Sequence, residues 1–395
     1  MAGPLDGIRV LEAGLLIQGP QAAAMLADMG ADVIKIELPG FGDQGRHIHV
    51  GPEDPRSAVY IACNRGKRSV ALDLRHPRGA EIFKALARDA DVFVSNFKPG
   101  TLESWGLGHD DLTKVNPGII CAQGSTFGPV GPDNEREGAD LAGQAVGGLI
   151  ATTGRDQDPP SPVGAFIADH VASLNLVAGI LAALHARAAS GRGQLVESSL
   201  LGGQIWAQAT EFTHSMLTGE PVGRANSGHS LIKGVYGIFE TADGWMAIPG
   251  VPPQARDAFF IAIERPDLTL DDRLQDIMIH RGFAWLKDQL VAAFKTRSTD
   301  HWCEVLRDAG LRYAPVRDHR QGLDDPGAWE NGYFAEVADE KGNAHRVVGA
   351  PIRMSETPLE PGATAPELGA HTEEVLRGIG IDTEEIAHLR AENII

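Results

Sequence analysis

The first 125 residues alternate between short apolar runs and longer stretches with helical spacing, and this alternation limits the possible folds more than any other feature of the chain. The segments 21–29 and 77–88 place their apolar residues at the spacing of a helix. The apolar runs have the length of strands and stand at 8–11, 33–36, 69–74, 92–95 and 119–122. Strands that alternate with helices predict a mostly parallel sheet with helices on its faces. We therefore expect an α/β fold whose large domain is Rossmann-like.

The second half of the chain predicts a smaller domain. Helical spacing dominates 139–185 and 197–217, after which the composition becomes rich in glycine and proline, as in a linker. Two strand-like runs between residues 236 and 248 predict a hairpin, helices follow it, and a last helix is expected at 372–379. The predicted division is a large domain over residues 1–217, a linker 218–230, a small α+β domain 231–320, a linker 321–331 and a C-terminal segment 332–395 that returns to the large domain.

The charge of the chain excludes two classes of partner. Its 53 acidic and 35 basic residues give a net charge of −18, and a field of this sign repels nucleic acid and anionic membranes. The longest apolar stretch, 171–184, is too short to cross a bilayer, and the first residues lack the pattern of a secretory signal. Three well separated cysteines without a CxxC pair indicate neither a disulfide framework nor a metal site. We expect a cytoplasmic protein with no metal, no nucleic acid and no membrane as partner.

One segment reverses the sign of the chain. Between residues 63 and 84, six basic residues stand against two acidic ones, a local charge of +4. A run of charge is most often a solvated face, but its reversal in an acidic chain favours a phosphate site. The basic residues are Arg65, Lys67, Arg68, Arg75, Arg78 and Lys84.

The motifs of common nucleotide-binding and hydrolytic enzymes are missing. A β-α-β start with Glu37 closing the second strand fits a dinucleotide-binding fold. However, residues 12–20 contain no GxGxxG, and Pro20 stands where the phosphate-binding helix would begin. No P-loop, HExxH or GxSxG motif occurs either. The sequence therefore disfavours a dehydrogenase.

Several longer blocks follow one another along the chain. They read PLDGIRVLEAG, GPQAAAMLADMGADVIKIELPGFGD, CNRGKRSVALDLRHPRG, ADVFVSNFKPGTLESWGLG, NPGIICAQGSTFGPVGP, FIADHVASLNLVAGILAALHARAASGRGQLVESSLL and APELGAHTEEVLRGIG. Together they resemble the class III CoA transferase family, the CaiB/BaiF-like group that includes the formyl-CoA and carnitine-CoA transferases. The resemblance implies two ring-like chains interlocked as a homodimer, each with a large Rossmann-like and a small α+β domain. It also implies a CoA thioester as substrate and no permanently bound cofactor.

The resemblance assigns the catalytic carboxylate to the aspartate of the IAD segment, Asp169. In the family such a carboxylate attacks an acyl-CoA thioester to give a mixed anhydride, and the released thiolate then forms an aspartyl-CoA thioester that a second acid consumes. The resemblance thus predicts an acyl-CoA:carboxylate CoA transferase whose partners are an acyl-CoA and a carboxylic acid. Asp169 also directly precedes a long apolar helical stretch, so a structural role as N-cap is open as well.

The resemblance also implies where CoA binds. Arginine and lysine side chains at these positions suit phosphates, and backbone groups around Leu72 and Leu74 suit the edge of adenine. Leu38 and Ser104 stand where well-studied members carry arginines, so the phosphate contacts must be rearranged. The implied contacts are Gln18, Leu72, Asp73, Leu74, Arg75, Asn96, Phe97, Lys98 and Arg136.

Two further interpretations stay open. An α-methylacyl-CoA racemase resembles these proteins throughout but needs an acid/base pair. Here Ala139 takes the position of the histidine in its GHD motif, and Pro252 takes that of its glutamate. A non-catalytic acyl-CoA binder would keep the fold without turnover. The stretch 250–254 replaces the GGGG lid of formyl-CoA transferases, which disfavours formate and oxalate as substrates.

Overall fold

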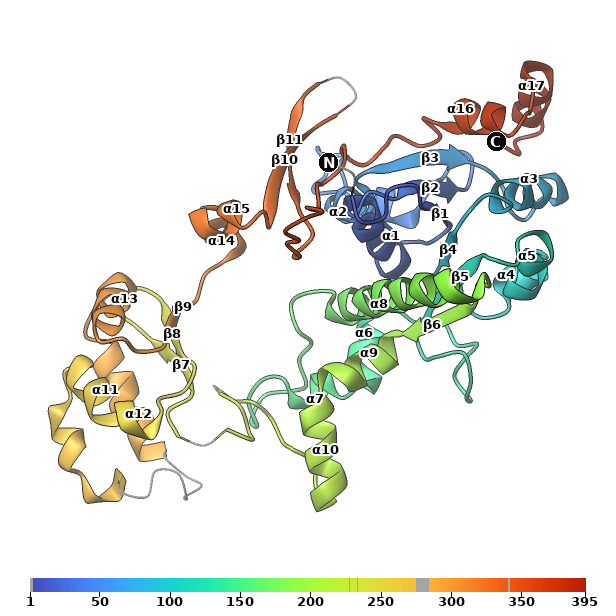
Figure 1. The fold of residues 1–395 in the computed structure, drawn as a ribbon. Coiled ribbons are helices and arrows are strands. Elements are labelled where there is room, and N and C mark those ends of the chain that lie inside the picture. The colour runs from blue at the N-terminus through green and yellow to red at the C-terminus, as the bar shows by residue number, and fades with distance from the viewer. Residues whose placement is uncertain (1–2, 227, 233, 275–283, 340–341) are drawn as a thin grey trace. The chain divides into compact units, whose positions relative to one another are not determined.

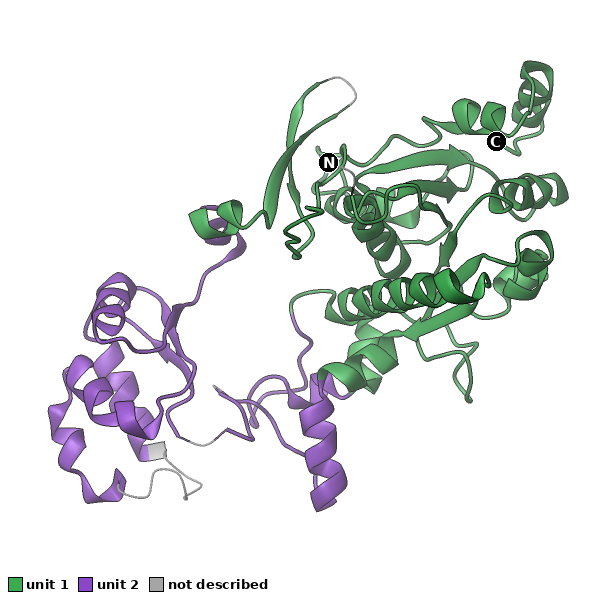
Figure 2. Ribbon diagram, viewed as in Figure 1, with its two compact units in different colours: residues 1–147, 164–207, 325–395 green, residues 148–163, 208–324 purple. Residues whose placement is uncertain are grey.

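The chain folds into two compact units (Figure 2). The computed structural model describes residues 3–226, 228–232, 234–274, 284–339 and 342–395. Unit 1 comprises residues 1–147, 164–207 and 325–395, and unit 2 comprises residues 148–163 and 208–324. Residues 148–163 and 208–217, which the composition assigns to the large domain, thus cluster with the smaller unit.

Unit 1 is built on a six-stranded parallel sheet with the order β3-β2-β1-β4-β5-β6 (Figure 1). The expected parallel sheet is therefore confirmed. The strand order reverses between β1 and β4, which pair in register at Val10 and Val92. In an open α/β sheet, ligands bind at the carboxyl ends of the strands beside such a reversal. The strands are β1 (Arg9–Glu12), β2 (Asp32–Glu37), β3 (Lys67–Ala71), β4 (Val92–Ser95), β5 (Ile120–Ser125) and β6 (Leu195–Ser199).

Helices cover both faces of this sheet, which explains why its inner strands read as nearly continuous apolar runs. Successive residues of a strand point to opposite faces, so Val10 packs in one core and Leu11 in the other. The core around Val10 is completed by α1 (Gln18–Asp28) and α8 (Ile167–Ser190). The core around Leu11 is completed by α3 (Pro77–Ala87), α5 (His109–Val115), α16 (Thr372–Gly378) and α17 (Thr383–Ala391).

The region after β5 differs from the expected run of helices. β6 begins at Leu195 and occupies the start of the segment predicted to be helical from residue 197, and the described residues 153–166 form no helix. β6 lies at the edge of the sheet with no fully buried residue, so its sequence lacks the apolar run that marks the inner strands. The helices of this region are α6 (Asp140–Val146), α7 (Leu149–Thr152), α9 (Leu200–Ala207) and α10 (Ala209–Thr218), and earlier in the chain lie η1 (Gln44–His47), α2 (Ala58–Asn64) and α4 (Thr101–Ser104).

Helix α8 is longer than the apolar stretch seen in the sequence. Among the described residues it is the one helix long and apolar enough to cross a membrane, with a mean hydropathy of 1.7 over its most apolar window. A core helix of a globular protein meets the same two criteria. α8 packs against α1, α9, β5 and β6, which places it on the sheet of unit 1.

Unit 2 has a core of its own beside the antiparallel sheet β7-β8-β9. The predicted hairpin is confirmed as β7 and β8, which pair from Gly237 with Ile248 to Glu240 with Trp245. The core includes the fully buried Trp302, whose indole Nε1 donates to the carbonyl oxygen of Phe294 at 2.8 Å. The elements are β7 (Gly237–Glu240), β8 (Trp245–Ile248), η2 (Pro253–Ala255), α11 (Arg256–Ala262), η3 (Pro266–Leu270), η4 (Asp272–Leu274), α12 (Ala284–Phe294), α13 (Thr299–Asp308), β9 (Ala314–Pro315) and α14 (His319–Leu323).

Residues 325–395 belong to unit 1 and return to its sheet. After α15 (Pro326–Glu330) they form the antiparallel hairpin of β10 (Phe334–Ala338) and β11 (Ala344–Val348), which no pattern in the sequence indicates. The expected last helix is present as α16, and α17 follows it. The chain then reaches the end of β3, where the Asp73 N–H donates to the carbonyl oxygen of Ile394 at 2.8 Å.

Replacing Trp302 is expected to destabilise the protein. Trp302→Ala leaves a cavity and an unpaired carbonyl in the core of unit 2, which should lower the free energy of unfolding by about 3–5 kcal/mol. The control is Leu270→Ala in the same unit, since Leu270 is 87% exposed and should change stability by less than about 0.5 kcal/mol. Urea unfolding followed by tryptophan fluorescence and circular dichroism measures both. Equal losses in the two variants would contradict the core position of Trp302.

Candidate active site

Asp169 lies in the first turn of α8, as its third residue. The predicted role as N-cap is therefore wrong in detail, because the helix begins two residues earlier and Phe166 takes the cap position without a side-chain hydrogen bond. The apolar stretch that suggested a later start is only the middle of the helix. At this place the first N–H groups of a 24-residue helix have no partner within the helix, and a negative charge is favoured there.

Asp140 supplies the missing cap from another helix. Its Oδ1 accepts the N–H groups of Ala168 at 2.8 Å and of Asp169 at 3.2 Å, and its Oδ2 accepts from Gln144 Nε2 at 2.6 Å. Gly143, one turn along α6, allows this approach, since a Cβ atom there would lie 3.0 Å from the Cβ atom of Ala168. The backbone of Asp169 is thus fixed to α6 by a charge-assisted hydrogen bond, and that of Ala168 by another.

The environment of Asp169 opposes its ionisation. Burial, together with the negative charge of Asp140, raises the pKa of Asp169 to about 7. Two carboxylates that share a site repel each other, and the loss of hydration adds to the effect. A carboxyl group that titrates near neutral pH at the start of a helix is a candidate functional residue.

Two neighbours on α8 join this turn to α1. The Ser173 hydroxyl donates to the carbonyl oxygens of Gln18 at 2.7 Å and of Asp169 at 2.9 Å. His170 Nδ1 contacts Gln21 Oε1, and burial lowers the pKa of His170 and favours the neutral ring. Apart from the adjacency of His170 to Asp169, no pattern in the sequence indicates these contacts, because the partners on α1 are about 150 residues away along the chain.

A second feature of unit 1 is a cavity of about 170 Å³ at the carboxyl ends of β1, β2 and β3. It brings together five of the residues implied to bind CoA, namely Leu72, Asp73, Leu74, Arg75 and Phe97. The Phe97 ring packs edge to face on Trp105, with 5.3 Å between the ring centroids. Leu38 and Phe41 contribute to the lining, so the wall at the position of the missing arginine is apolar.

The other residues implied to bind CoA lie outside this lining. Gln18 is buried at the start of α1, and its amide covers Gly124 so closely that a Cβ atom there would collide with Gln18 Oε1. Asn96 bonds to the backbone of Leu15 through both ends of its amide, and Lys98 is exposed. Arg136 forms an ion pair with Asp133 at 3.1 Å and lies over the Phe127 ring, 4.2 Å from its centroid.

The basic segment 63–84 does not form one phosphate site. Five of its six basic residues form ion pairs with carboxylates, most of which come from distant parts of the chain. Arg65 pairs with Asp28, Lys67 with Glu12, Arg68 with Asp32 and Glu374, Arg75 with Asp73, and Arg78 with Glu81 and Glu385. Among the described residues, no group of three or more His, Cys, Asp and Glu side chains is arranged to hold a metal ion.

The fold and the site are those of an enzyme with a candidate nucleophile. The sheet is doubly wound, a cavity lies beside the point where the strand order reverses, and the half-buried Asp169 carboxyl stands at the start of a helix. The chain belongs to CoA-transferase family III, whose model matches residues 5–372. This confirms the resemblance seen in the sequence, and the chain is a CoA transferase.

Known relatives and structures match the chain over nearly its full length. It is 33% identical over 400 residues to the succinyl-CoA–D-citramalate CoA-transferase of Chloroflexus aurantiacus, covering 99% of this chain and 98% of the relative. It is 34% identical over 392 residues to the succinyl-CoA:mesaconate CoA-transferase of Haloarcula marismortui, covering 96% and 98%. A CAIB/BAIF family protein from Brucella suis superposes with a TM-score of 0.84 at 28% identity, covering 96% of this chain and 100% of that structure.

Removing the charge of Asp140 should move the titration of Asp169. Carbodiimides react with the protonated carboxyl, so mass mapping of the Asp169 peptide after modification at a series of pH values reports its pKa. We expect a midpoint near pH 7 in the unaltered protein and a lower midpoint in Asp140→Asn, because one of the two causes that raise the pKa is gone. The control Asp110→Asn removes a fully exposed carboxylate and should leave the midpoint unchanged. A midpoint that Asp140→Asn does not lower would contradict the coupling.

Proposed function

We propose that this CoA transferase moves CoA from an acyl-CoA to a second carboxylic acid through covalent intermediates on Asp169. The position of Asp169 carries the proposal. Its backbone N–H is bound to Asp140 in the first turn of α8, and its carboxyl group is partly buried, with a pKa of about 7. A carboxylate with a raised pKa is a stronger nucleophile, and near neutral pH about half of it is ionised.

Each step of this cycle balances without a proton. An oxygen of the Asp169 carboxylate attacks the thioester carbonyl, the C–S bond breaks, and CoA leaves as thiolate with an acyl-aspartyl anhydride on the enzyme. The thiolate attacks the aspartyl carbonyl of the anhydride, releases the first acid as a carboxylate and leaves an aspartyl-CoA thioester. The incoming carboxylate reverses both steps, which restores Asp169 and forms the new acyl-CoA.

The absence of proton transfer separates this proposal from a racemase. Abstraction of an α-proton requires an acid/base pair. Ala139 stands at the position of the racemase histidine, and both oxygens of the neighbouring Asp140 are engaged by α8 and Gln144. The proposed cycle uses only a carboxylate that ionises near neutral pH.

We further propose succinyl-CoA as acyl donor and a dicarboxylic acid as acceptor. The Chloroflexus and Haloarcula relatives are named for succinyl-CoA together with D-citramalate or mesaconate, each a dicarboxylic acid. The adenine of CoA is proposed to occupy the cavity lined by Leu72, Leu74 and Phe97, where an apolar wall and backbone groups suit a planar heterocycle. In this proposal the substrates are CoA thioesters, as membership of the CoA-transferase family implies.

The active form is proposed to be a homodimer in the cytoplasm. Large apolar side chains are exposed along α8, β6 and α9, three elements of unit 1 that pack against one another. Exposed apolar side chains on elements that pack against one another are a candidate interaction surface. The residues are Leu174, Leu181, Leu195, Ile205 and Trp206.

Trapping the covalent intermediates tests the nucleophile. The protein is incubated with succinyl-CoA, treated with hydroxylamine and mapped by peptide mass spectrometry. We expect hydroxamate on Asp169 alone, and a loss of kcat of at least about 10³-fold in Asp169→Ala. Asp110→Ala, which removes a fully exposed carboxylate outside the cavity and α8, serves as control and should be labelled at Asp169 like the unaltered protein. Label on another residue, or undiminished turnover in Asp169→Ala, would rule out the covalent role.

Charges placed on the exposed face of α8 should separate the subunits. The double variant Leu174→Glu with Leu181→Glu puts two carboxylates seven residues apart on one side of the helix. We expect monomers in size-exclusion chromatography with light scattering, and loss of transferase activity. Monomers that retain full activity would contradict the need for a dimer.

A further inference from the structure

The loop after β1, residues 13–16, is held by side chains from β1, from β2 and from the residue that follows β4. The Gly14 carbonyl oxygen accepts from Lys35 Nζ at 3.0 Å, and the Gly14 N–H donates to Glu12. Leu15 donates its N–H to Asn96 Oδ1 at 2.7 Å, and its carbonyl oxygen accepts from Asn96 Nδ2 at 2.9 Å. Three successive residues of this loop, 13–15, line the cavity.

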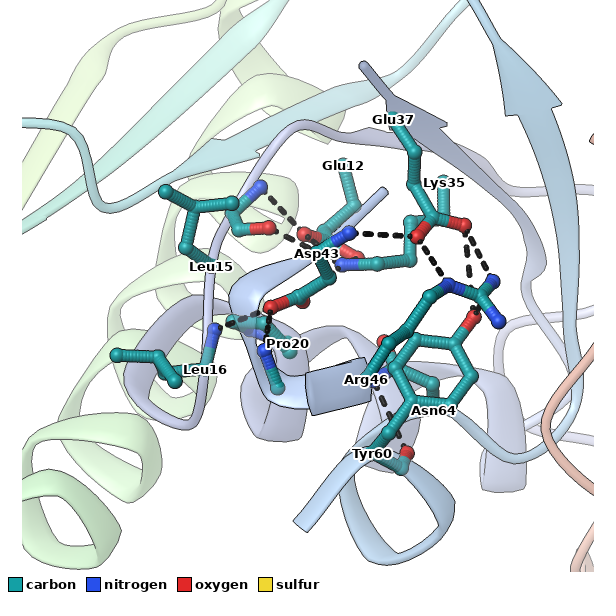
Figure 3. A network of polar contacts seen from close by, with 12 residues as sticks. Glu12, Leu15, Leu16, Pro20, Lys35, Glu37, Asp43, Arg46, Tyr60 and Asn64 are labelled. Atoms are coloured by element: carbon teal, nitrogen blue, oxygen red, sulfur yellow. Dashed lines mark hydrogen bonds and ion pairs between the residues drawn. The ribbon is translucent and has the colours of Figure 1, made fainter. Parts of the chain in front are cut away.

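The next residue of the loop is held in an unfavourable conformation. Leu16 has a φ of 62°, in the left-handed region that residues other than glycine rarely adopt. Such a residue persists only where its surroundings over-determine its conformation, and such residues cluster at functional sites. The contact that fixes Leu16 is its N–H, which donates to Asp43 Oδ1 at 2.9 Å (Figure 3).

A buried charge determines where Asp43 lies. Lys35 on β2 is fully buried, and its Nζ lies 2.9 Å from Asp43 Oδ2 and 3.1 Å from Glu12 Oε2 (Figure 3). Burial opposes the charged ammonium, but the carboxylates of Glu12, Asp43 and Glu37 together raise the pKa of Lys35 above its usual value. A buried charge without a partner is very costly, so Asp43 is bound to a fixed point of the sheet.

Asp43 therefore joins the two sides of the cavity. One side is formed by residues 13–15, which Leu16 follows, and the other by residues 38 and 41–44, which include Asp43 itself. The Asp43 N–H also donates to Glu37 Oε2 at 3.0 Å, and its Oδ1 accepts from the Gly45 N–H at 2.7 Å. The Asp43 side chain thus joins the two sides of the cavity to Lys35 on β2, and the Asp43 backbone is bound to Glu37 at the end of that strand.

We infer that Asp43 and Asn96 are positioning residues that hold the strained loop 14–16, Asp43 against residues 38–44 and Asn96 against the end of β4, and thereby preorganise the cavity for the nucleotide end of CoA. This inference rests on the proposed function, which places CoA in the cavity. Neither residue needs to touch the ligand: Asn96 acts through the backbone of Leu15, and Asp43 acts through that of Leu16. A preorganised site binds more tightly because it loses less conformational freedom on binding.

Titration calorimetry with free CoA tests the inference. Asp43→Asn and Asn96→Ala are each expected to raise the Kd for CoA at least about tenfold, because the loop relaxes from its strained conformation. Asparagine has one acceptor oxygen, and when that oxygen faces Lys35 its amide nitrogen turns toward the Leu16 N–H, so the contact that holds Leu16 is lost. Adding Leu16→Gly to Asp43→Asn is expected to lower that Kd again at least about threefold, since glycine adopts a positive φ without the contact to Asp43. A merely structural effect of Asp43→Asn would not be reversed by a glycine at position 16.

The matched control is Tyr60→Phe. The Tyr60 hydroxyl belongs to the same buried network but bonds to Arg46, Glu37 and Pro366 rather than to residues 14–16. Its Kd for CoA should therefore stay within about twofold while its melting temperature falls.

Each outcome bears on one of the two proposals. If Asp43→Asn fails to fold, Asn96→Ala decides the question, because Asn96 carries no buried charge. Failure of the unaltered protein to bind CoA would overturn the proposed function together with this inference. Binding that neither Asp43→Asn nor Asn96→Ala weakens would overturn the inference alone.

Discussion

The burial of two lysines of the parallel sheet is the constraint on which unit 1 depends. Lys35 and Lys67 stand on neighbouring strands, and both reach the carboxylate of Glu12 on a third. Since none of these charges meets water, the strands and the loop that brings Asp43 to Lys35 have one arrangement in which every charge is paired. Lys67 extends the same cluster to α1 by donating to the carbonyl oxygen of Pro20 at 2.8 Å. Through α1 and the bond between Ser173 and Gln18, the position of α8 is tied to the same point.

The parts of the fold that could be predicted from the sequence are those whose signal is local. The inner strands of the sheet are covered on both faces, so consecutive residues in them are apolar and mark them in the sequence. These strands are β1, β2, β4 and β5. β6 and the hairpin of β10 and β11 are only partly buried, and short, half-exposed strands leave no such pattern. The division into units was equally hard to locate, because residues 148–163 join unit 2 across a long separation in sequence.

For the site, resemblance and physics contributed different elements. Asp169 came from the family motif, whereas one reason for its raised pKa is an aspartate 29 residues away, a contact that no spacing rule indicates. The basic segment was misleading for the same reason, since local charge counts ignore partners such as Asp28 and Glu374 that only the fold brings near. Leu72–Arg75 and Phe97 do meet at one cavity, because parallel strands bring their carboxyl ends to the same edge of the sheet.

The hydrogen bond between Asp73 and Ile394 has a consequence for the order in which the protein is made. The stretch that borders the cavity is translated early, but its backbone partner emerges from the ribosome more than 300 residues later, after all of unit 2. Unit 2 carries its own core and is free to fold during synthesis, whereas the edge strand β3 of unit 1 receives the bond from the His371 N–H to the Ser69 carbonyl oxygen only afterwards. Exposed strand edges invite aggregation, so the nascent chain is most vulnerable to it during this interval.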